Sequence, residues 1–264
     1  MERMPTEFTL EEVLKGKATS IKGKDYLPTR GYIEPFLERV QKLTSDIRVH
    51  VKLPDQITYN KNGDIDTADL TFNRVWLEAV LPNEYSVDNH KETINMLYGL
   101  DTRKPIIKFF RTGLNMACLN MCVFNPSYIR VSELSPDKPV DYSPVKTLVE
   151  ATDSLGVFIK TLKNTEFNTS ESNINISLGY WVRQAITEFE DNGFGKIKLA
   201  TSEVIASYKR MFEDSKSDYY IGINGEASMF EVYNSFTEGI SNDNNKDIMN
   251  KFEKCVLLKK ILNL

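Results

Sequence analysis

Histidine, cysteine and familiar catalytic motifs are scarce in this sequence. Its 264 residues include two histidines, His50 and His90, and three cysteines. An odd number of thiols does not suit the disulfide framework of a secreted protein and indicates a reducing compartment. Cys118 and Cys122 alone cannot supply the four ligands of a structural zinc site. We therefore expect the cysteines to pack in the core, the histidines to be ordinary surface or hydrogen-bonded residues, and no metal to be bound.

Long hydrophobic runs are also missing. The longest uncharged stretch, residues 112–128, is broken by Gly, Asn and Pro. It is short of the roughly 18 to 20 apolar residues that a helix needs to cross a bilayer. Residues 1–5 contain neither an apolar segment nor the small-residue cleavage site of a signal peptide. We expect a cytoplasmic protein without membrane contact.

Motifs of phosphate-binding loops and common hydrolases are absent. The chain contains no G-x-x-x-x-G-K-[ST], G-x-G-x-x-G, G-x-S-x-G or H-E-x-x-H. The Asn- and Asp-rich residues 60–69 lack the order of a calcium loop. These absences predict no cofactor and no catalytic residue. A hydrolase or nuclease using Glu238 or Asp101 is the alternative that the sequence favours least.

Material for a folded core is present. Hydrophobic residues make up 41 % of the chain and charged residues 27 %, with 14 Phe and 12 Tyr. These fractions are ordinary for a globular protein. The length suits one large domain, or a core domain with a helical appendage.

Hydrophobic periodicity predicts an α+β fold. Thr9 is a suitable N-cap for a short helix, and Asn62-Gly63 marks a hairpin turn. Residues 87–97 are ambiguous and fit a loop with a short helix best, and residues 116–124 fit a strand or a helix. Strands are expected over 47–53, 74–81, 106–114 and 128–131. Helices are expected over 10–14, 31–43, 145–163, 178–190, 202–212, 229–240 and 247–262.

This order of elements predicts three regions. Residues 1–24 form an N-terminal helix and a basic linker, and residues 25–134 a strand-rich α+β core. Residues 135–264 form a helical part packed on that core as one domain. The expected architecture is an antiparallel sheet in the N-terminal half packed against a helical C-terminal half.

Charge is unevenly distributed along the chain. The net charge is −4, whereas a dedicated duplex-DNA binder usually carries a basic surplus. Residues 99–130 hold five cations and one acid, and residues 213–247 hold eight acids and two cations. The middle of the chain is therefore basic and its C-terminal third acidic.

The basic middle mixes cations with aromatic rings, as proteins that bind single-stranded nucleic acid do. The predicted nucleic-acid-binding residues are Arg103, Lys104, Lys108, Phe109, Arg111, Tyr128 and Arg130. The alternative places the rings in the core and the cations in solvent. Strand alternation requires Phe109 or Phe110 to face inward.

A second polar group lies on a predicted helix and contains Tyr233, Asn234, Thr237 and Glu238. Helical spacing brings Asn234, Thr237 and Glu238 to one face. We expect a structural cluster that holds another segment by hydrogen bonds. The alternative, with Glu238 as a general base, lacks a visible catalytic partner.

Three segments carry a family resemblance. Residues 74–82 read Arg-Val-Trp-Leu-Glu-Ala-Val-Leu-Pro, and residues 98–114 combine a turn, a strand and an arginine before Cys118 and Asn120. Residues 228–238 contain a Phe-x-x-Tyr-Asn-x-x-Thr-Glu pattern. Their order is similar to that in the phage/plasmid-like protein family, a domain of unknown function. The resemblance implies a mobile genetic element and work near DNA replication, recombination or host conflict.

Two hypotheses follow from these patterns. The first is a phage- or plasmid-encoded, non-enzymatic protein that binds single-stranded DNA in replication or recombination, as a homo-oligomer. The second is a protein-interaction factor that inhibits or redirects a host defence protein through the acidic C-terminal third. Salt-sensitive oligonucleotide binding supports the first. A stoichiometric protein partner without nucleic acid supports the second.

Overall fold

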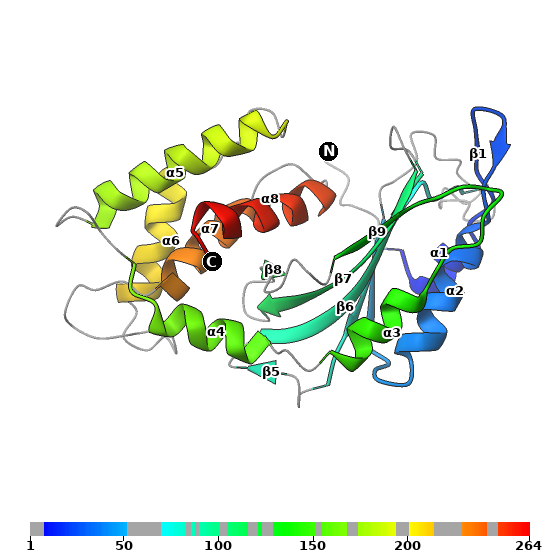
Figure 1. The fold of residues 1–264 in the computed structure, drawn as a ribbon, viewed down its shortest axis with the longest axis horizontal. Coiled ribbons are helices and arrows are strands. Elements are labelled where there is room, and N and C mark those ends of the chain that lie inside the picture. Colours follow the sequence, from blue (N-terminus) through cyan, green and yellow to red (C-terminus); the bar gives the residue numbers. More distant parts are fainter. Residues whose placement is uncertain are drawn as a thin grey trace, which may run out of the picture. The chain divides into compact units, whose positions relative to one another are not determined.

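The protein is seen in a computed structural model that contains two compact units (Figure 1). Unit 1 comprises Met1–Tyr85, Glu92–Thr112 and Asn125–Thr152, and unit 2 comprises Ser86–Lys91, Gly113–Phe124 and Asp153–Leu264. The structure describes residues 8–51, 70–82, 86–87, 90–100, 105–115, 121–122, 129–151, 155–167, 174–193, 201–213, 229–241 and 248–264. None of the helices in these ranges has the length and hydropathy that a bilayer crossing requires.

The predicted α+β class is confirmed. An antiparallel sheet occupies the N-terminal half, and most helices lie in the C-terminal half. Its strands are β3 (Ile47–Val51), β4 (Arg74–Val80), β5 (Ser86–Val87), β6 (His90–Gly99), β7 (Ile106–Asn115), β8 (Met121–Cys122) and β9 (Arg130–Glu133). They follow the order β3-β4-β6-β7-β8, with β5 paired to β6 and β9 paired to β7.

A small separate hairpin joins β1 (Ser20–Ile21) to β2 (Lys24–Asp25). Its turn residues Lys22 and Gly23 have φ angles of 53° and 73°. Left-handed conformations of this kind are typical of a tight two-residue turn.

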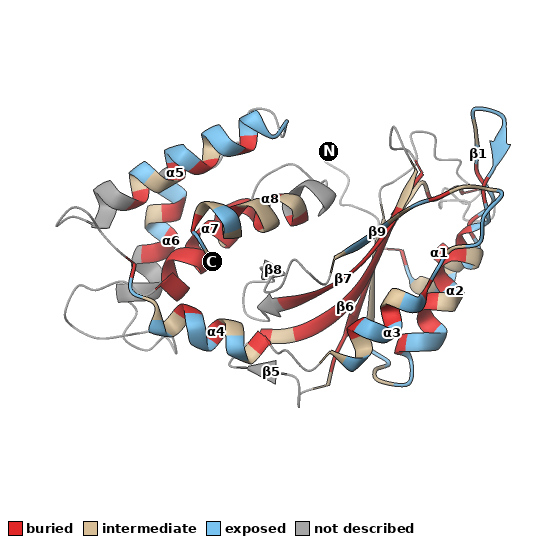
Figure 2. Cartoon of the chain, viewed as in Figure 1, coloured by how far each residue is buried: buried red, intermediate tan, exposed pale blue. Residues whose placement is uncertain are grey.

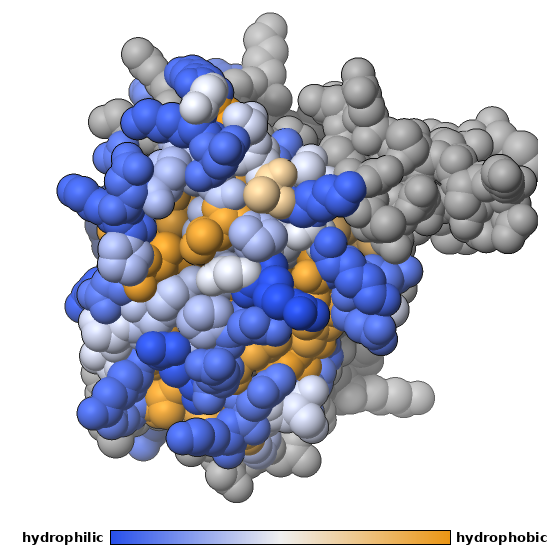
Figure 3. All heavy atoms as spheres, turned by 90° about the vertical axis from the view of Figure 1, so that its right-hand side faces the viewer, coloured by the Kyte–Doolittle hydropathy of each residue, from blue (hydrophilic) through white to orange (hydrophobic). Residues whose placement is uncertain are grey.

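Three helices of unit 1 cover one face of the sheet: α1 (Leu10–Leu14), α2 (Thr29–Val40) and α3 (Ser143–Glu150) (Figure 1). Alternate residues of β4, including Val75, Leu77 and Ala79, pack with Phe36 of α2 and Val145 of α3 in one apolar cluster. The side of unit 1 that carries α1, α2 and β1 is mostly hydrophilic, with hydrophobic atoms showing between the charged side chains (Figure 3).

The local sequence accounts for the start of α1 and places a proline within α2. Thr9 and Glu12 form a capping box in which each side chain bonds the other residue's backbone N–H. These bonds from Thr9 lower the pKa of the Glu12 carboxyl. Pro35 lies inside α2. It is the seventh residue of the helix, beyond the first turn, so its missing N–H removes one intrahelical hydrogen bond, and the helix nevertheless continues to Val40.

Two expectations about the elements were wrong. Residues 87–97 are not a loop with a helix but contain β6, in which Thr93, Ile94, Asn95 and Met96 are all buried. A strand buried on both faces loses the alternation of polar and apolar residues that would reveal it. Residues 145–163 form two helices rather than one, because Ala151 adopts an extended conformation with ψ 124°. The expected hairpin at residues 56–72 lies mostly outside the described residues.

Unit 2 is built mainly of helices. They are α4 (Leu155–Asn164), α5 (Ile174–Asp191), α6 (Thr201–Glu213), α7 (Met229–Ser241) and α8 (Ile248–Ile261). α7 packs against α4, α6 and α8 and is buried along almost its whole length (Figure 2). It is therefore the central helix of this unit.

Candidate functional site

Most described members of the predicted nucleic-acid set are inside the protein. Arg103, Lys104 and Tyr128 lie outside the described residues. Of the remainder, Lys108, Phe109 and Arg111 are buried and Arg130 is exposed. The expectation that Lys108, Phe109 and Arg111 emerge on one open face was wrong, because both faces of β7 are covered.

Phe109 belongs to the core between the sheet and the helices. Its ring centroid lies 6.5 Å from that of Phe36 and 5.4 Å from that of Tyr142. Only 1 % of the residue is exposed. Its ring is therefore not available to stack on a base.

Arg111 is neutralised inside unit 1, where both of its terminal nitrogens have partners. Its guanidinium forms an ion pair with Glu92, and both side chains are almost completely buried. The same group donates hydrogen bonds to the carbonyls of Leu148, at 3.1 Å, and Ala151, at 2.5 Å. These carbonyls belong to the C-terminal end of α3, where such groups lack partners within the helix. Arg111 thus holds α3 to the sheet and is not a surface cation.

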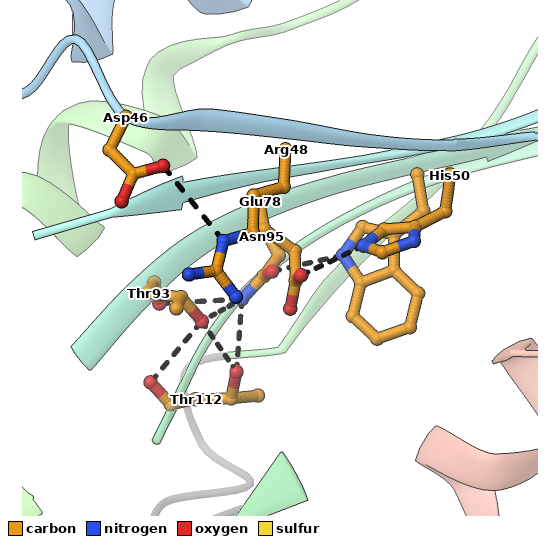
Figure 4. Close-up of polar contacts among 8 residues, drawn as sticks. Asp46, Arg48, His50, Glu78, Thr93, Asn95 and Thr112 are labelled. Atoms are coloured by element: carbon orange, nitrogen blue, oxygen red, sulfur yellow. Dashed lines mark hydrogen bonds and ion pairs between the residues drawn. The ribbon is translucent and has the colours of Figure 1, made fainter. Parts of the chain in front are cut away.

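The sheet face opposite the helices of unit 1 is unusually polar for a buried surface, and we call it the polar face. It consists of Trp76, Glu78, Thr93, Asn95, Lys108, Phe110 and Thr112, all of which are buried. Figure 4 shows its central contacts. Buried polar groups are costly unless they are hydrogen-bonded, so their arrangement is informative.

Asn95 is the centre of the polar face (Figure 4). Its Oδ1 accepts a hydrogen bond from Trp76 Nε1 at 2.9 Å. Its Nδ2 donates to the hydroxyls of Thr93, at 2.9 Å, and Thr112, at 3.1 Å, and these hydroxyls are 2.7 Å from each other. Both the oxygen and the nitrogen of the Asn95 amide are therefore hydrogen-bonded within the protein. This network ties β4, β6 and β7 together.

His50 and Glu78 form the accessible end of the polar face. His50 Nε2 lies 2.9 Å from Glu78 Oε2, with 39 % of the histidine side chain exposed and 7 % of the glutamate side chain. The imidazole also contacts the Trp76 ring at 5.6 Å. A carboxylate in this position orients the imidazole through a hydrogen bond. His50 has no second hydrogen-bond partner among the described residues. The pair therefore lacks, within these residues, the nucleophilic side chain that a catalytic histidine would activate.

The polar face was missed in the sequence because its residues belong to different strands and one strand was not predicted. Thr93 and Asn95 fall in the segment expected to be a loop. The alternation of β4 did predict that Trp76 and Glu78 face away from Val75 and Leu77. No group of three or more His, Cys, Asp and Glu side chains in the described ranges lies close enough to hold a metal ion.

The predicted cluster on α7 contains both local and cross-helix bonds. Asn234 Nδ2 donates to Phe230 O at 3.0 Å, and Thr237 Oγ1 donates to Asn234 O at 3.0 Å. Glu238 accepts a hydrogen bond from Ser207 of α6. Tyr233 is buried. Two members thus bond their own helix, Glu238 bonds α6, and the Tyr233 ring contacts Phe158 of α4 at 5.7 Å.

Among the strands of the sheet whose burial is described, the edge strand β9 is the most open. Three of its four residues are exposed and the fourth is intermediate, whereas residues 107–109 of the neighbouring β7 are buried (Figure 2). Val131 is 54 % exposed, which is unusual for a large hydrophobic residue of this protein. The opposite edge, β3, is half-buried at every position.

The ladder between β7 and β9 determines which backbone groups face outward. Val131 lies opposite Lys108, and Ser132 lies opposite Ile107. Leu134 N donates to Pro105 O at 2.8 Å, which makes that pair a hydrogen-bonded one. Such pairs alternate in antiparallel ladders. Ser132 and Arg130 therefore bond β7, while the N–H and C=O of Val131 and Glu133 point outward.

The outward groups of β9 have no partner in the part of the chain that the structure describes. The same holds for the Glu133 carboxylate, which forms no ion pair there. Such an edge is able to accept another extended chain.

No protein-family model, no curated protein and no solved structure matches this chain.

Proposed function

We propose that this chain is a non-enzymatic interaction protein that binds a host protein by accepting one of its extended segments as a new strand beside β9. The observation that carries the proposal is the exposed outer side of β9, with the backbone groups of Val131 and Glu133 directed away from β7. In strand addition the main chain supplies the hydrogen bonds and the side chains select the partner. The bound host protein is thereby blocked or redirected.

The composition of β9 favours a selected partner over indiscriminate association. Edge strands are commonly protected by charges, by Pro or by short length. β9 has four residues, with Arg130 and Glu133 at its two ends. Between them Val131 offers a β-branched apolar side chain, which suits a strand pair. The edge is therefore open to a matching strand but short and charged enough to limit aggregation.

The resemblance to phage/plasmid-like proteins supports the biological setting of the proposal. A protein of a mobile element works among host proteins, and a host defence protein is the kind of target that such an element needs to inhibit. The acidic residues 213–247 were also expected to contact the partner; of their acids whose side chains are described, Glu231 is buried and Glu238 accepts a hydrogen bond from Ser207, so the proposal rests on β9.

Single-stranded DNA is the competing ligand. Exposed Arg130 and the surplus of positive charge in residues 99–130 favour it. The burial of Phe109 and the ion pair of Arg111 with Glu92 weigh against it, because stacking rings and free cations are the two parts of such a site.

The experiment is a quantitative pull-down from host lysate with the wild-type chain and two variants of one residue. Val131→Pro removes an outward N–H and leaves the bonds of Ser132 to β7 in place, whereas Val131→Thr keeps the N–H and the β-branched shape. We expect a stoichiometric protein partner to be retained by wild type and Val131→Thr and to be lost by Val131→Pro.

A matched surface control is Val157→Lys, since Val157 of α4 is 65 % exposed and distant in sequence from β9. This variant should retain the partner, while Val131→Lys should lose it. A partner that binds all variants equally contradicts the proposal. Binding of a single-stranded oligonucleotide at low salt, with no β9-dependent protein, establishes the DNA alternative instead.

A further inference from the structure

We infer that the strand accepted by β9 runs antiparallel to it and carries a basic residue two positions before an apolar residue. This inference rests on the proposed function, because it specifies the partner of the same edge. It follows from the direction of the outward backbone groups and from the two side chains that accompany them.

The antiparallel direction follows from the geometry of the sheet. The ladders β3–β4, β4–β6, β5–β6, β7–β8 and β7–β9 are all antiparallel. Val131 and Glu133 each present an N–H and a C=O to the same side. An antiparallel partner satisfies both groups of each residue with a single residue opposite, and such pairing is slightly more stable per residue than parallel pairing.

The side chains of Val131 and Glu133 lie on the same face of β9, because they are two residues apart in a strand. Each would lie beside the side chain of the partner residue directly opposite. An apolar residue opposite Val131 covers the exposed valine. A basic residue opposite Glu133 pairs with its carboxylate.

The residues of β7 opposite Glu133 and Val131 are not complementary to these two side chains. Glu133 lies opposite Ile106 of β7, which is apolar and cannot neutralise a carboxylate. Val131 lies opposite Lys108, whose side chain is buried. On the outer side, an apolar residue would cover Val131 and a basic residue would pair with the exposed carboxylate of Glu133.

The order of the two partner residues depends on the strand direction. Because an antiparallel strand runs backwards past β9, the residue opposite Glu133 precedes the residue opposite Val131 by two positions. A basic-x-apolar segment places both side chains correctly. The reversed order, apolar-x-basic, puts a cation beside Val131 and a hydrophobic group beside Glu133.

The test uses two synthetic peptides of identical composition, measured by fluorescence anisotropy with the full chain. Both have a threonine framework; one contains Lys-Thr-Val at its centre and the other contains Val-Thr-Lys. Two matched cross-strand pairs should make the first peptide bind about fivefold more tightly than the second. Glu133→Lys should abolish this preference and transfer it to a Glu-Thr-Val peptide.

The controls separate the failure of this inference from the failure of the proposed function. Equal binding of the two lysine peptides, tighter binding of Val-Thr-Lys, or a preference that persists in Glu133→Lys overturns the inference. The inference is also overturned if no peptide binds while Val131→Pro still loses a lysate partner. In each of these outcomes the proposed function survives. Peptide and lysate binding that is insensitive to Val131→Pro overturns both. Circular dichroism of Glu133→Lys shows whether the variant folds.

Discussion

At the scale of single residues, Asn95 has an importance that its type does not suggest. Its one carboxamide joins Trp76, Thr93 and Thr112 across three strands. A buried amide with this many partners stabilises the protein only as long as all of them remain paired.

Replacing Asn95 by Ala should therefore lower the free energy of unfolding by about 1 to 3 kcal/mol, because Trp76 Nε1 loses its acceptor in a buried site. Urea unfolding followed by tryptophan fluorescence measures the change. Thr187→Ala is a suitable control, because the Thr187 hydroxyl bonds Arg183 O on an exposed part of α5. A loss no larger than that of the control would show that the network contributes little.

The buried ion pair of Arg111 and Glu92 leads to a second prediction. Glu92→Gln leaves the guanidinium charged and buried without its counter-ion, which should cost about 3 to 5 kcal/mol in denaturant unfolding. The same substitution at Glu150, whose ion pair with Lys146 at 3.7 Å is exposed, should change stability by about 0.5 kcal/mol or less. If the two variants unfold alike, Arg111 does not depend on Glu92.

Neither Asn95 nor Glu92 could be identified from the sequence as a structural residue. Both lie in a segment whose polar and apolar residues do not alternate by burial, and their partners Trp76, Thr112 and Arg111 on other strands are 17 to 19 residues away along the chain. Sequence spacing reveals side chains that meet on one helix or strand. Side chains that meet across strands are revealed only when the pairing of the strands is known.

At the scale of elements, the helices were predicted better than the strands. α1 follows from its N-cap, and α5 to α8 follow from apolar residues at helical spacing, which in α7 include Phe230, Tyr233 and Phe236. β4 and β7 were recognisable as short β-prone runs beside Pro. β6 was not, since it has two buried faces, and the break between α3 and α4 has no Gly or Pro to mark it.

The junction between α1 and α2 yields the third prediction. A Cβ at Gly16 would lie 2.5 Å from Thr29 Oγ1 and 2.6 Å from Phe72 Cδ2, and both side chains are buried. Gly16→Ala should therefore destabilise unit 1 by about 1 to 3 kcal/mol through overpacking.

The prediction is tested by comparing the thermal unfolding of Gly16→Ala with that of Gly31→Ala, which serves as the control. At Gly31 the nearest atoms lie 3.2 Å or more away and belong to the exposed side chain of Leu27, which can move. Alanine also favours the helix at this position. An equal loss in both variants would mean that the close approach at Gly16 is relieved without cost.

At the scale of the whole molecule, the two units are not consecutive pieces of the chain. The sequence predicted that a strand-rich region, 25–134, and a helical region, 135–264, pack as one domain. The structure divides the chain into two compact units instead: α3 belongs to unit 1, and residues 86–91 and 113–124 belong to unit 2. Composition reports the local type of structure. It does not report which segments pack together, so this part of the organisation could not be predicted.

Buried tyrosines in both units make stability sensitive to alkaline pH, which is the fourth prediction. Burial raises the pKa of Tyr98 and Tyr142 in unit 1. Burial, with the nearby charge of Glu231, raises the pKa of Tyr208 in unit 2 to about 12. Unfolded tyrosines ionise near pH 10. Stability should be unaffected by these groups below about pH 10 and should fall as the pH rises through about 12, because only the unfolded chain releases the protons.

Guanidinium unfolding at several pH values between about 9 and 11.5 measures this loss, and tyrosinate absorbance of the folded protein checks its cause. The buried tyrosines should titrate later than the exposed ones. A single titration of all tyrosines near pH 10 in the folded state would exclude this explanation.

The polar face also decides how the strands are aligned. Sliding β6 by one residue past β4 would move Asn95 into the apolar cluster and bring Ile94 or Met96 beside Thr112, exchanging every side chain between the two faces. In a sheet with one solvent-exposed face, such a slip is unfavourable because it exposes apolar side chains to water. Here both faces are buried, and the amide and hydroxyls of the polar face impose the penalty instead: they select one alignment among several that hydrophobic packing alone would tolerate.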